Sequence, residues 1–401
     1  MRPQGRLLIA GSTLSQLGNW VNVTAVMIAL QQQHGAALVA VYFLARTIAP
    51  YFLARPLVNV VPSRLVGRAW ALSQVALTLI MLCLAVWNQN TPLVIALLAG
   101  AGVLQSATSS WLLHIAEAAE SSESSERRAL ITAISTGTSV AIVAGPAVGG
   151  ILQGWGGLPP VFVFDAATFA VSLALVPWWR LRPQEAQGAD HRSATSMVLS
   201  SLLPLKPRIH AKIGALVGAW IAFGLFGGLL TAIETPVFAT IKSFTSDQIG
   251  GAISAYGLGG LVVFAASMLF GFSSRYLSTS AIALVGVIGW TLGESWFVYV
   301  SFFITGLGFA LVNSTARVAF SDIFARAEAK SSEAWAWVNQ LSLFTSIAAY
   351  LTAWIYFSFN GDLRLAEGLV VTLGVVCVGF SVRWDYADRS LPRPGGGDLH
   401  E

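Results

Sequence analysis

The chain has 401 residues, of which 55% are hydrophobic and only 10% are charged. Soluble domains carry about 25% charged residues, so this composition predicts an integral membrane protein. The net charge is +4, but the basic residues lie in short loops between apolar segments, which argues against nucleic-acid binding. Cys83 and Cys377 both fall within apolar segments, so neither a disulfide framework nor a metal site is expected.

Apolar segments long enough to cross a bilayer core of about 30 Å recur along the whole chain. They predict an all-α membrane protein with 12 transmembrane helices in two six-helix bundles. We expect a first bundle at residues 1–179, a cytoplasmic linker at 180–211, a second bundle at 212–385 and a disordered tail at 386–401. The segments lie near residues 7–30, 36–61, 70–87, 92–113, 130–153 and 160–178, and then 212–239, 248–272, 277–294, 296–318, 334–359 and 365–382.

The positions of the basic residues predict the orientation in the membrane. Most of the 23 lysines and arginines fall on one side if the N-terminus is cytoplasmic, whereas Lys242 and Arg364 fall on the other. The positive-inside rule therefore places both termini and the linker in the cytoplasm. The first apolar segment lacks a cleavage site of small residues and is followed by further spans, so it is interpreted as a helix and not as a signal peptide.

A polar stripe runs along the first segment. Ser12, Ser15, Gln16, Asn19 and Asn22 recur at spacings of three and four, which places them on one face of a helix. Such a face must contact protein or water within a membrane. Interhelical hydrogen bonding is one explanation, and a cavity wall that binds substrate through Ser15, Gln16, Asn19 and Asn22 is the one that the whole stripe favours.

Two other segments carry faces of small residues, which allow the backbones of two helices to approach closely. We expect these two faces to pack together as the sliding surface between the bundles. In the fifth segment the set comprises Gly137, Ala141, Gly145 and Gly149, with Pro146 and Gly150 beside them, and in the eighth it comprises Gly251, Ala255 and Gly259.

The sequence GPAVGG in the fifth segment matches the GPxxGG signature of helix 5 in the antiporter branch of the major facilitator superfamily. The chain also has SQLGNW in the first segment, two sets of six spans and a basic linker between them. Together these features resemble that superfamily. Within it, the chain is similar to drug and natural-product exporters that include enterobactin and macrolide efflux proteins. The resemblance implies secondary transport by alternating access. The sequence has no P-loop, HExxH or GxSxG pattern, which argues against ATP-driven transport and an enzyme, and no cofactor is expected.

The second segment and its loop, PYFLARPLVNVVPSRLVGR, follow the pattern of this branch only in part. Pro50, Pro56, Arg64, Gly67 and Arg68 match. The departures are Asn59 in place of glycine, Ser63 in place of the loop aspartate, and Asn19 where many relatives have a membrane aspartate. An amide carries no proton at physiological pH, so the residue most often linked to proton coupling in the family is missing.

Arg46 is predicted to lie near the bilayer midplane, where an arginine costs about 2.5 to 3.5 kcal/mol and therefore faces the bundle. It is either a fixed ion-pair partner of a neighbouring helix or a substrate-binding cation. Arg55 lies nearer the cytoplasmic end and is expected to extend to the interface.

The acidic candidates for proton coupling are Glu234, which precedes Pro236, and Asp165. Both are predicted to be shallow enough for hydration, and a structural role is favoured for Asp165. His114 is expected to be an interface residue.

These features predict a monomeric secondary transporter of the bacterial cytoplasmic (inner) membrane that works in the lipid bilayer. It would export an amphipathic or anionic small molecule, such as a siderophore-like natural product or a drug, by proton antiport. The alternatives are an importer or facilitator of an anionic metabolite such as a siderophore, and a non-transporting membrane module. The polar stripe and both small faces argue against the last of these.

Overall fold

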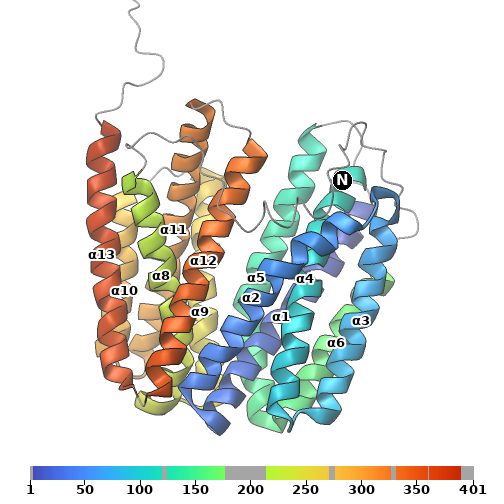
Figure 1. The fold of residues 1–401 in the computed structure, drawn as a ribbon, viewed down its shortest axis with the longest axis horizontal. Coiled ribbons are helices and arrows are strands. Elements are labelled where there is room, and N and C mark those ends of the chain that lie inside the picture. Colours follow the sequence, from blue (N-terminus) through green and yellow to red (C-terminus); the bar gives the residue numbers. More distant parts are fainter. Residues whose placement is uncertain are drawn as a thin grey trace, which may run out of the picture.

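The computed structural model describes residues 3–119, 124–176, 214–270, 276–326, 331–359 and 361–389. Within these ranges the chain forms twelve α-helices, which stand side by side in two groups of six (Figure 1). The first half comprises α1 (Pro3–His34), α2 (Ala36–Val60), α3 (Val66–Trp87), α4 (Thr91–Ala119), α5 (Ser124–Gly156) and α6 (Leu158–Leu175). The second comprises α8 (Gly214–Pro236), α9 (Ser246–Phe270), α10 (Tyr276–Leu292), α11 (Trp296–Arg326), α12 (Ser331–Ser358) and α13 (Leu363–Arg389).

Ten of the helices in the described ranges are long and apolar enough to cross a membrane. The other two are α1, whose polar side chains interrupt its apolar run, and α10, whose apolar part, Thr279–Leu292, is short. The linker at 180–211 lies outside the described residues. Residues 386–389, expected in the tail, are instead the last turn of α13.

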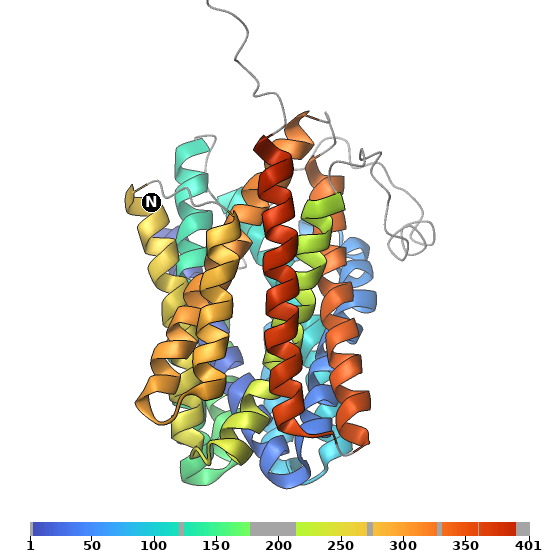
Figure 2. The same ribbon diagram turned by 90° about the vertical axis from the view of Figure 1, so that its left-hand side faces the viewer.

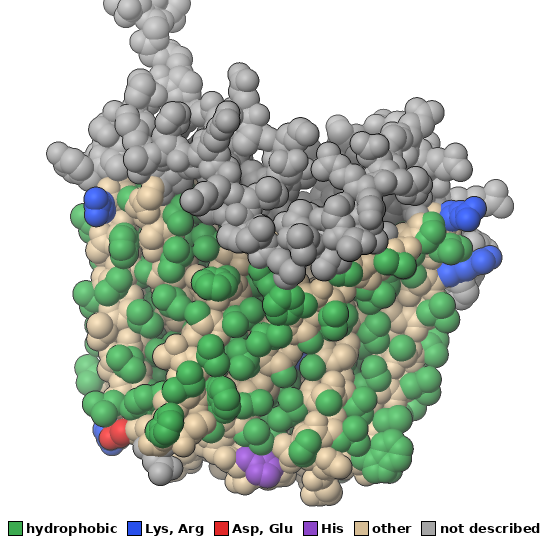
Figure 3. All heavy atoms as spheres, in the orientation of Figure 1, with side chains coloured by type: hydrophobic (Ala, Val, Ile, Leu, Met, Phe, Trp, Pro, Cys, Tyr) green, Lys and Arg blue, Asp and Glu red, His purple; other side chains and the backbone are tan. Residues whose placement is uncertain are grey.

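The outer surface of the bundle is apolar. Leu72, Val86, Trp155, Val285 and Val318 are each more than half exposed. Figure 3 shows hydrophobic side chains over the middle of this face, with charged side chains near its two ends. In the second half, α13 packs against α8 and α10, and Figure 2 shows these helices running nearly parallel. An apolar belt between two charged rims is the surface expected for a protein surrounded by lipid.

The two halves contact each other through α5 and α9, as expected from their small residues. A Cβ atom on Gly150 would collide with the backbone carbonyl of Ser246, and one on Gly250 would collide with the carbonyl of Pro146. The backbone N–H of Ala147 donates to Ser254 Oγ at 2.9 Å. The two helix backbones are therefore in direct contact, which only glycine permits at Gly150 and Gly250.

The small faces predicted for this contact have other partners, so that part of the expectation is wrong. Gly137, Gly145 and Gly149 face α1, where added Cβ atoms would meet Thr13, Trp20 and Val21. Each residue of a helix turns the side-chain direction by about 100°, so Gly150 faces α9 while its neighbour Gly149 faces α1.

The same correction applies to α9. An added Cβ on Gly251 would meet Tyr299 at 3.1 Å, and one on Gly259 would collide with the backbone of Phe303. Both partners belong to α11 of the same half. The contact with α5 uses Gly250, Ser254 and Gly257 instead.

Further contacts between the halves gather at the end of the bundle where α1 meets α2. Gln31 Nε2 donates to Thr240 Oγ1 at 3.2 Å, and Gln32 Nε2 donates to Ser246 Oγ at 3.3 Å. The ring of Phe43 stacks on that of Tyr350, with centroids 5.1 Å apart. The ribbons of the two halves diverge toward the opposite end, which carries the N-terminus (Figure 1). The halves are therefore closed together at the end away from the N-terminus.

Candidate functional site

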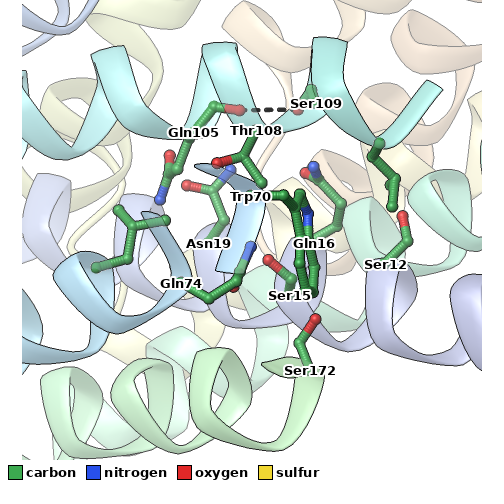
Figure 4. Close-up of a pocket in the computed structure, with 12 residues that line it drawn as sticks. Ser12, Ser15, Gln16, Asn19, Trp70, Gln74, Gln105, Thr108, Ser109 and Ser172 are labelled. Atoms are coloured by element: carbon green, nitrogen blue, oxygen red, sulfur yellow. Dashed lines mark hydrogen bonds between the residues drawn. The ribbon is translucent and has the colours of Figure 1, made fainter. Parts of the chain in front are cut away.

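A polar cavity lies inside the first half, between α1, α3, α4 and α6 (Figure 4). The space between its atoms amounts to about 390 Å³, which includes open solvent. Every lining residue belongs to the first half. They are Ser12, Ser15, Gln16 and Asn19 of α1, Trp70, Gln74 and Leu77 of α3, Gln105, Thr108, Ser109 and Leu112 of α4, and Ser172 of α6.

The structure brings together three of the four predicted substrate-binding residues of α1. Ser15, Gln16 and Asn19 line the cavity together with Ser12, so the stripe forms a cavity wall. Asn22 does not line it, because its side chain is directed to Asp165 of α6, to which Nδ2 donates at 2.7 Å. Asn22 is 1% exposed and its side chain is bonded within the protein. Its role as a substrate ligand stays a prediction.

Arg46 of α2 lies beside the cavity and is held by three neutral oxygen atoms. Its Nη1 donates to the hydroxyl of Tyr42 at 3.3 Å, and its Nη2 donates to Gln105 Oε1 at 3.0 Å and to Asn19 Oδ1. None of these acceptors carries a charge, and no carboxylate within the described ranges forms an ion pair with Arg46. Among the described residues Arg46 thus forms no direct salt bridge, which was one of the two sequence-based alternatives, although the Asp165 carboxylate interacts with it electrostatically. Arg46 places a positive charge next to a polar cavity.

Asp165 of α6 is buried between α6 and α1 and lies outside the set of cavity-lining residues. One carboxylate oxygen accepts a hydrogen bond from Asn22 Nδ2 at 2.7 Å. The hydroxyl of Thr168 lies 3.4 Å from the other carboxylate oxygen, Oδ1. A Cβ atom on Gly18 of α1 would collide with Asp165 and Thr168, so only glycine fits at that position. The side chain is 0% exposed, so the expectation that hydration accommodates this carboxylate is wrong. Hydrogen bonds within the protein take the place of water.

Glu234 occupies the last turn of α8 and is 8% exposed. Pro236 ends this helix, and the chain continues as a single π-helical turn, η4 (Val237–Ile241). Glu234 interacts electrostatically with Tyr256 and Tyr350, and Tyr350 is the ring that stacks on Phe43 of the first half. Within the described ranges no side chain hydrogen-bonds to the Glu234 carboxyl group. The Glu234 carboxyl group is therefore buried without a side-chain hydrogen bond among the described residues, and it lies near the contact between the halves.

The cavity-lining residues of α3, α4 and α6 were not predicted from the sequence. Gln74 and Gln105 are uncharged polar residues in the middle of apolar spans, so the rule applied to α1 would have found them. Three buried polar atoms here have no hydrogen-bond partner in the described part of the chain. They are Gln74 Oε1, Gln105 Nε2 and Ser172 Oγ. Buried polar atoms in this state are candidates for ligand contact.

Several predictions concern side chains that the structure does not describe. Those of Arg55, Asn59, Ser63 and His114 lie outside the described residues. The interpretation of the loop after α2 and of the inner end of α4 therefore stays a prediction.

The fold and the site define a multi-pass helical membrane protein with a polar cavity inside one of two six-helix groups. Residues 8–349 match the family model of the Major Facilitator Superfamily, so the chain belongs to this family of membrane transporters. A search of curated proteins found no match to the chain. Family membership agrees with the resemblance expected from GPAVGG and from the division into two halves.

Proposed function

We propose that the protein is a secondary transporter of the bacterial cytoplasmic membrane that exports an amphipathic or anionic small molecule by proton antiport. The single observation that carries the anionic preference is Arg46, a cation held by neutral atoms beside the polar cavity. Unit charges about 4 Å apart attract by about 4 kcal/mol at an effective dielectric of 20, so such a cation favours an anion over an amine. A siderophore-like carboxylate fits this site better than a cationic dye.

The distribution of basic residues supports a cytoplasmic N-terminus and linker. With that orientation, the end at which the halves are closed faces the outside. The described conformation is then one in which the halves diverge on the cytoplasmic side, the side from which an exporter loads. Alternating access would follow from separation of α5 and α9 at the closed end.

Glu234 is the acid that we propose to carry the coupled proton. Its carboxyl group is buried, and it interacts electrostatically with Tyr350, the ring that stacks across the two halves. Asp165, hydrogen-bonded to Asn22 and Thr168, is the second candidate, and its bonds favour a structural role.

Flux into inside-out vesicles tests this proposal. Export by proton antiport accumulates substrate in an acidified lumen, and nigericin with valinomycin, which together collapse the pH gradient and the membrane potential, abolishes the accumulation. An importer or facilitator equilibrates substrate without accumulation, and a non-transporting module gives the flux of vesicles that lack the protein. Either of the last two results would overturn proton-driven export.

A further inference from the structure

We infer that Arg46 holds two amide side chains in place, so that the cavity recognises a hydrogen-bond acceptor of its ligand, a carbonyl or carboxylate oxygen, through Gln105 Nε2. Arg46 is then a positioning residue as well as a source of charge. The inference rests on the proposed function in one respect, because it takes this cavity to be the place where the transported molecule binds.

The hydrogens of the Arg46 guanidinium group limit how it can bind a ligand. An arginine grips a carboxylate with two parallel N–H bonds, either from Nη1 and Nη2 or from Nε and Nη2. Both pairs include Nη2, which carries two hydrogens. Asn19 Oδ1 and Gln105 Oε1 both accept from Nη2 of Arg46. Neither two-pronged grip is therefore available to a ligand in this conformation.

Arg46 also limits how the two amides can turn. Because Oε1 of Gln105 accepts from Arg46, reversing this amide would bring an NH2 group against the N–H of the guanidinium. The same holds for Asn19. Arginine stays charged at all physiological pH values, so this constraint is permanent. Arg46 thereby fixes each amide with its oxygen toward the guanidinium and its NH2 group directed elsewhere.

The NH2 nitrogen of Gln105, Nε2, is buried, and it has no hydrogen-bond partner in the described part of the protein. Gln105 enters the cavity from α4, as Figure 4 shows. A buried donor without an acceptor is unfavourable, and it cannot be relieved here by reversing the amide. A ligand oxygen placed in the cavity would satisfy it.

The remaining walls indicate what else the ligand carries. Gln74 Oε1 on α3 and Ser172 Oγ on α6 are also buried without a partner among the described residues. Both atoms can accept a hydrogen bond. A ligand group with an oxygen toward α4 and an N–H or O–H toward α3 satisfies Gln105 Nε2 and Gln74 Oε1. Amides and hydroxy acids have this pattern, and the charge of Arg46 adds a preference for carboxylates over amines.

The test is equilibrium dialysis of three matched probes, phenylbutyrate, phenylbutanamide and phenylbutylamine, against the protein in nanodiscs, with empty nanodiscs as the blank. We expect the carboxylate and the neutral amide to bind and the amine to bind more weakly. Gln105→Met keeps the side-chain length, removes the donor and releases one Nη2 hydrogen of Arg46. Both acceptor probes should then bind about tenfold more weakly.

Direct gripping by Arg46 predicts the opposite sign, because the released hydrogen restores a two-pronged site and phenylbutyrate should bind more tightly. Arg46→Met separates positioning from charge. Loss of positioning weakens the neutral amide probe as well, whereas loss of charge alone weakens only the carboxylate. Gln89→Met, the same substitution at an exposed loop position, serves as the control and should leave all three affinities unchanged.

Unchanged or tighter phenylbutyrate binding by folded Gln105→Met protein would overturn the inference, as would wild-type protein that binds neither acceptor probe. If Arg46→Met fails to fold, the Gln105→Met result decides. The assay uses no gradient. If the probes bind in the expected pattern but the protein exports nothing, only the proposed function is refuted. If the protein exports substrate but the probes do not bind in that pattern, only this inference is refuted.

Discussion

Replacing Gly150 with alanine should shift the protein away from the conformation in which the halves are closed at the end opposite the N-terminus. The new Cβ would overlap the carbonyl of Ser246 and lie 3.1 Å from Gly250 Cα. Both are backbone atoms, which cannot rotate aside, and carbon contacts are optimal at about 3.5 to 4.0 Å. Overpacking of this kind costs about 1 to 3 kcal/mol. A cost of that size changes a conformational equilibrium roughly 5- to 150-fold.

Double electron–electron resonance measures this shift directly. Spin labels at Gln89 and Glu294 place one label on each half at the closed end, in a protein whose Cys83 and Cys377 are replaced by alanine. The Gly150→Ala protein should show a larger population at long distances than the wild type.

The control substitution lies on the same helix. Gly154→Ala adds a Cβ 3.6 Å from Ser246 Cβ, an ordinary contact, and should leave the distances unchanged. If folded Gly150→Ala protein gave the wild-type distance distribution, the contact between α5 and α9 would not govern the closed state.

Three further substitutions test other contacts. Asn22→Leu removes the donor to Asp165 and should lower the free energy of unfolding by about 1.5 to 3 kcal/mol, which the thermal midpoint of purified protein would reveal; an unchanged midpoint argues that the carboxylate is satisfied otherwise. Gly145→Leu collides with Trp20 of α1 in the same half, so it should reduce the yield of folded protein instead of shifting the spin-label distances; normal yield would contradict that packing. Glu234→Gln keeps the shape but cannot be protonated, so flux should continue down a substrate gradient and lose its response to an imposed pH gradient; a retained response excludes Glu234 as the coupling acid.

Helical periodicity was enough to predict the parts of the site that lie on one helix. The spacing of Ser15, Gln16 and Asn19 within an apolar segment determines that they share a face, and a polar face in a membrane helix must find polar surroundings. The division into two groups of six helices follows in the same way from the lengths of the apolar runs.

Partner choice was not predictable from spacing. Gly149 and Gly150 are neighbours in sequence, yet one packs on α1 and the other on α9. Small residues indicate that some backbone approaches, but which helix approaches depends on how all the helices pack. The same limit explains Asn22, because nothing in its own segment indicates that Asp165 of α6 lies beside it.

The hydrogen bonds of Arg46 show a third limit. The sequence predicts a bundle-facing cation, and the structure has one. Gln105 follows Arg46 by 59 positions, and their contact arises from the packing of α2 against α4. A substrate-binding cation was therefore one of the two expectations from sequence, whereas the occupied Nη2 group emerges only from the fold.

Uptake of phenylbutyrate into inside-out vesicles by wild-type and Arg46→Gln protein tests the central claim, proton-driven export of an anionic molecule through the Arg46 site, most directly. A weak acid that crosses the bilayer passively is excluded from an acidic lumen, so accumulation there requires the transporter. We predict accumulation by the wild type that nigericin with valinomycin abolishes, and its loss in Arg46→Gln protein present in the membrane at equal amount. Equal accumulation by both proteins, or none by the wild type, would contradict it.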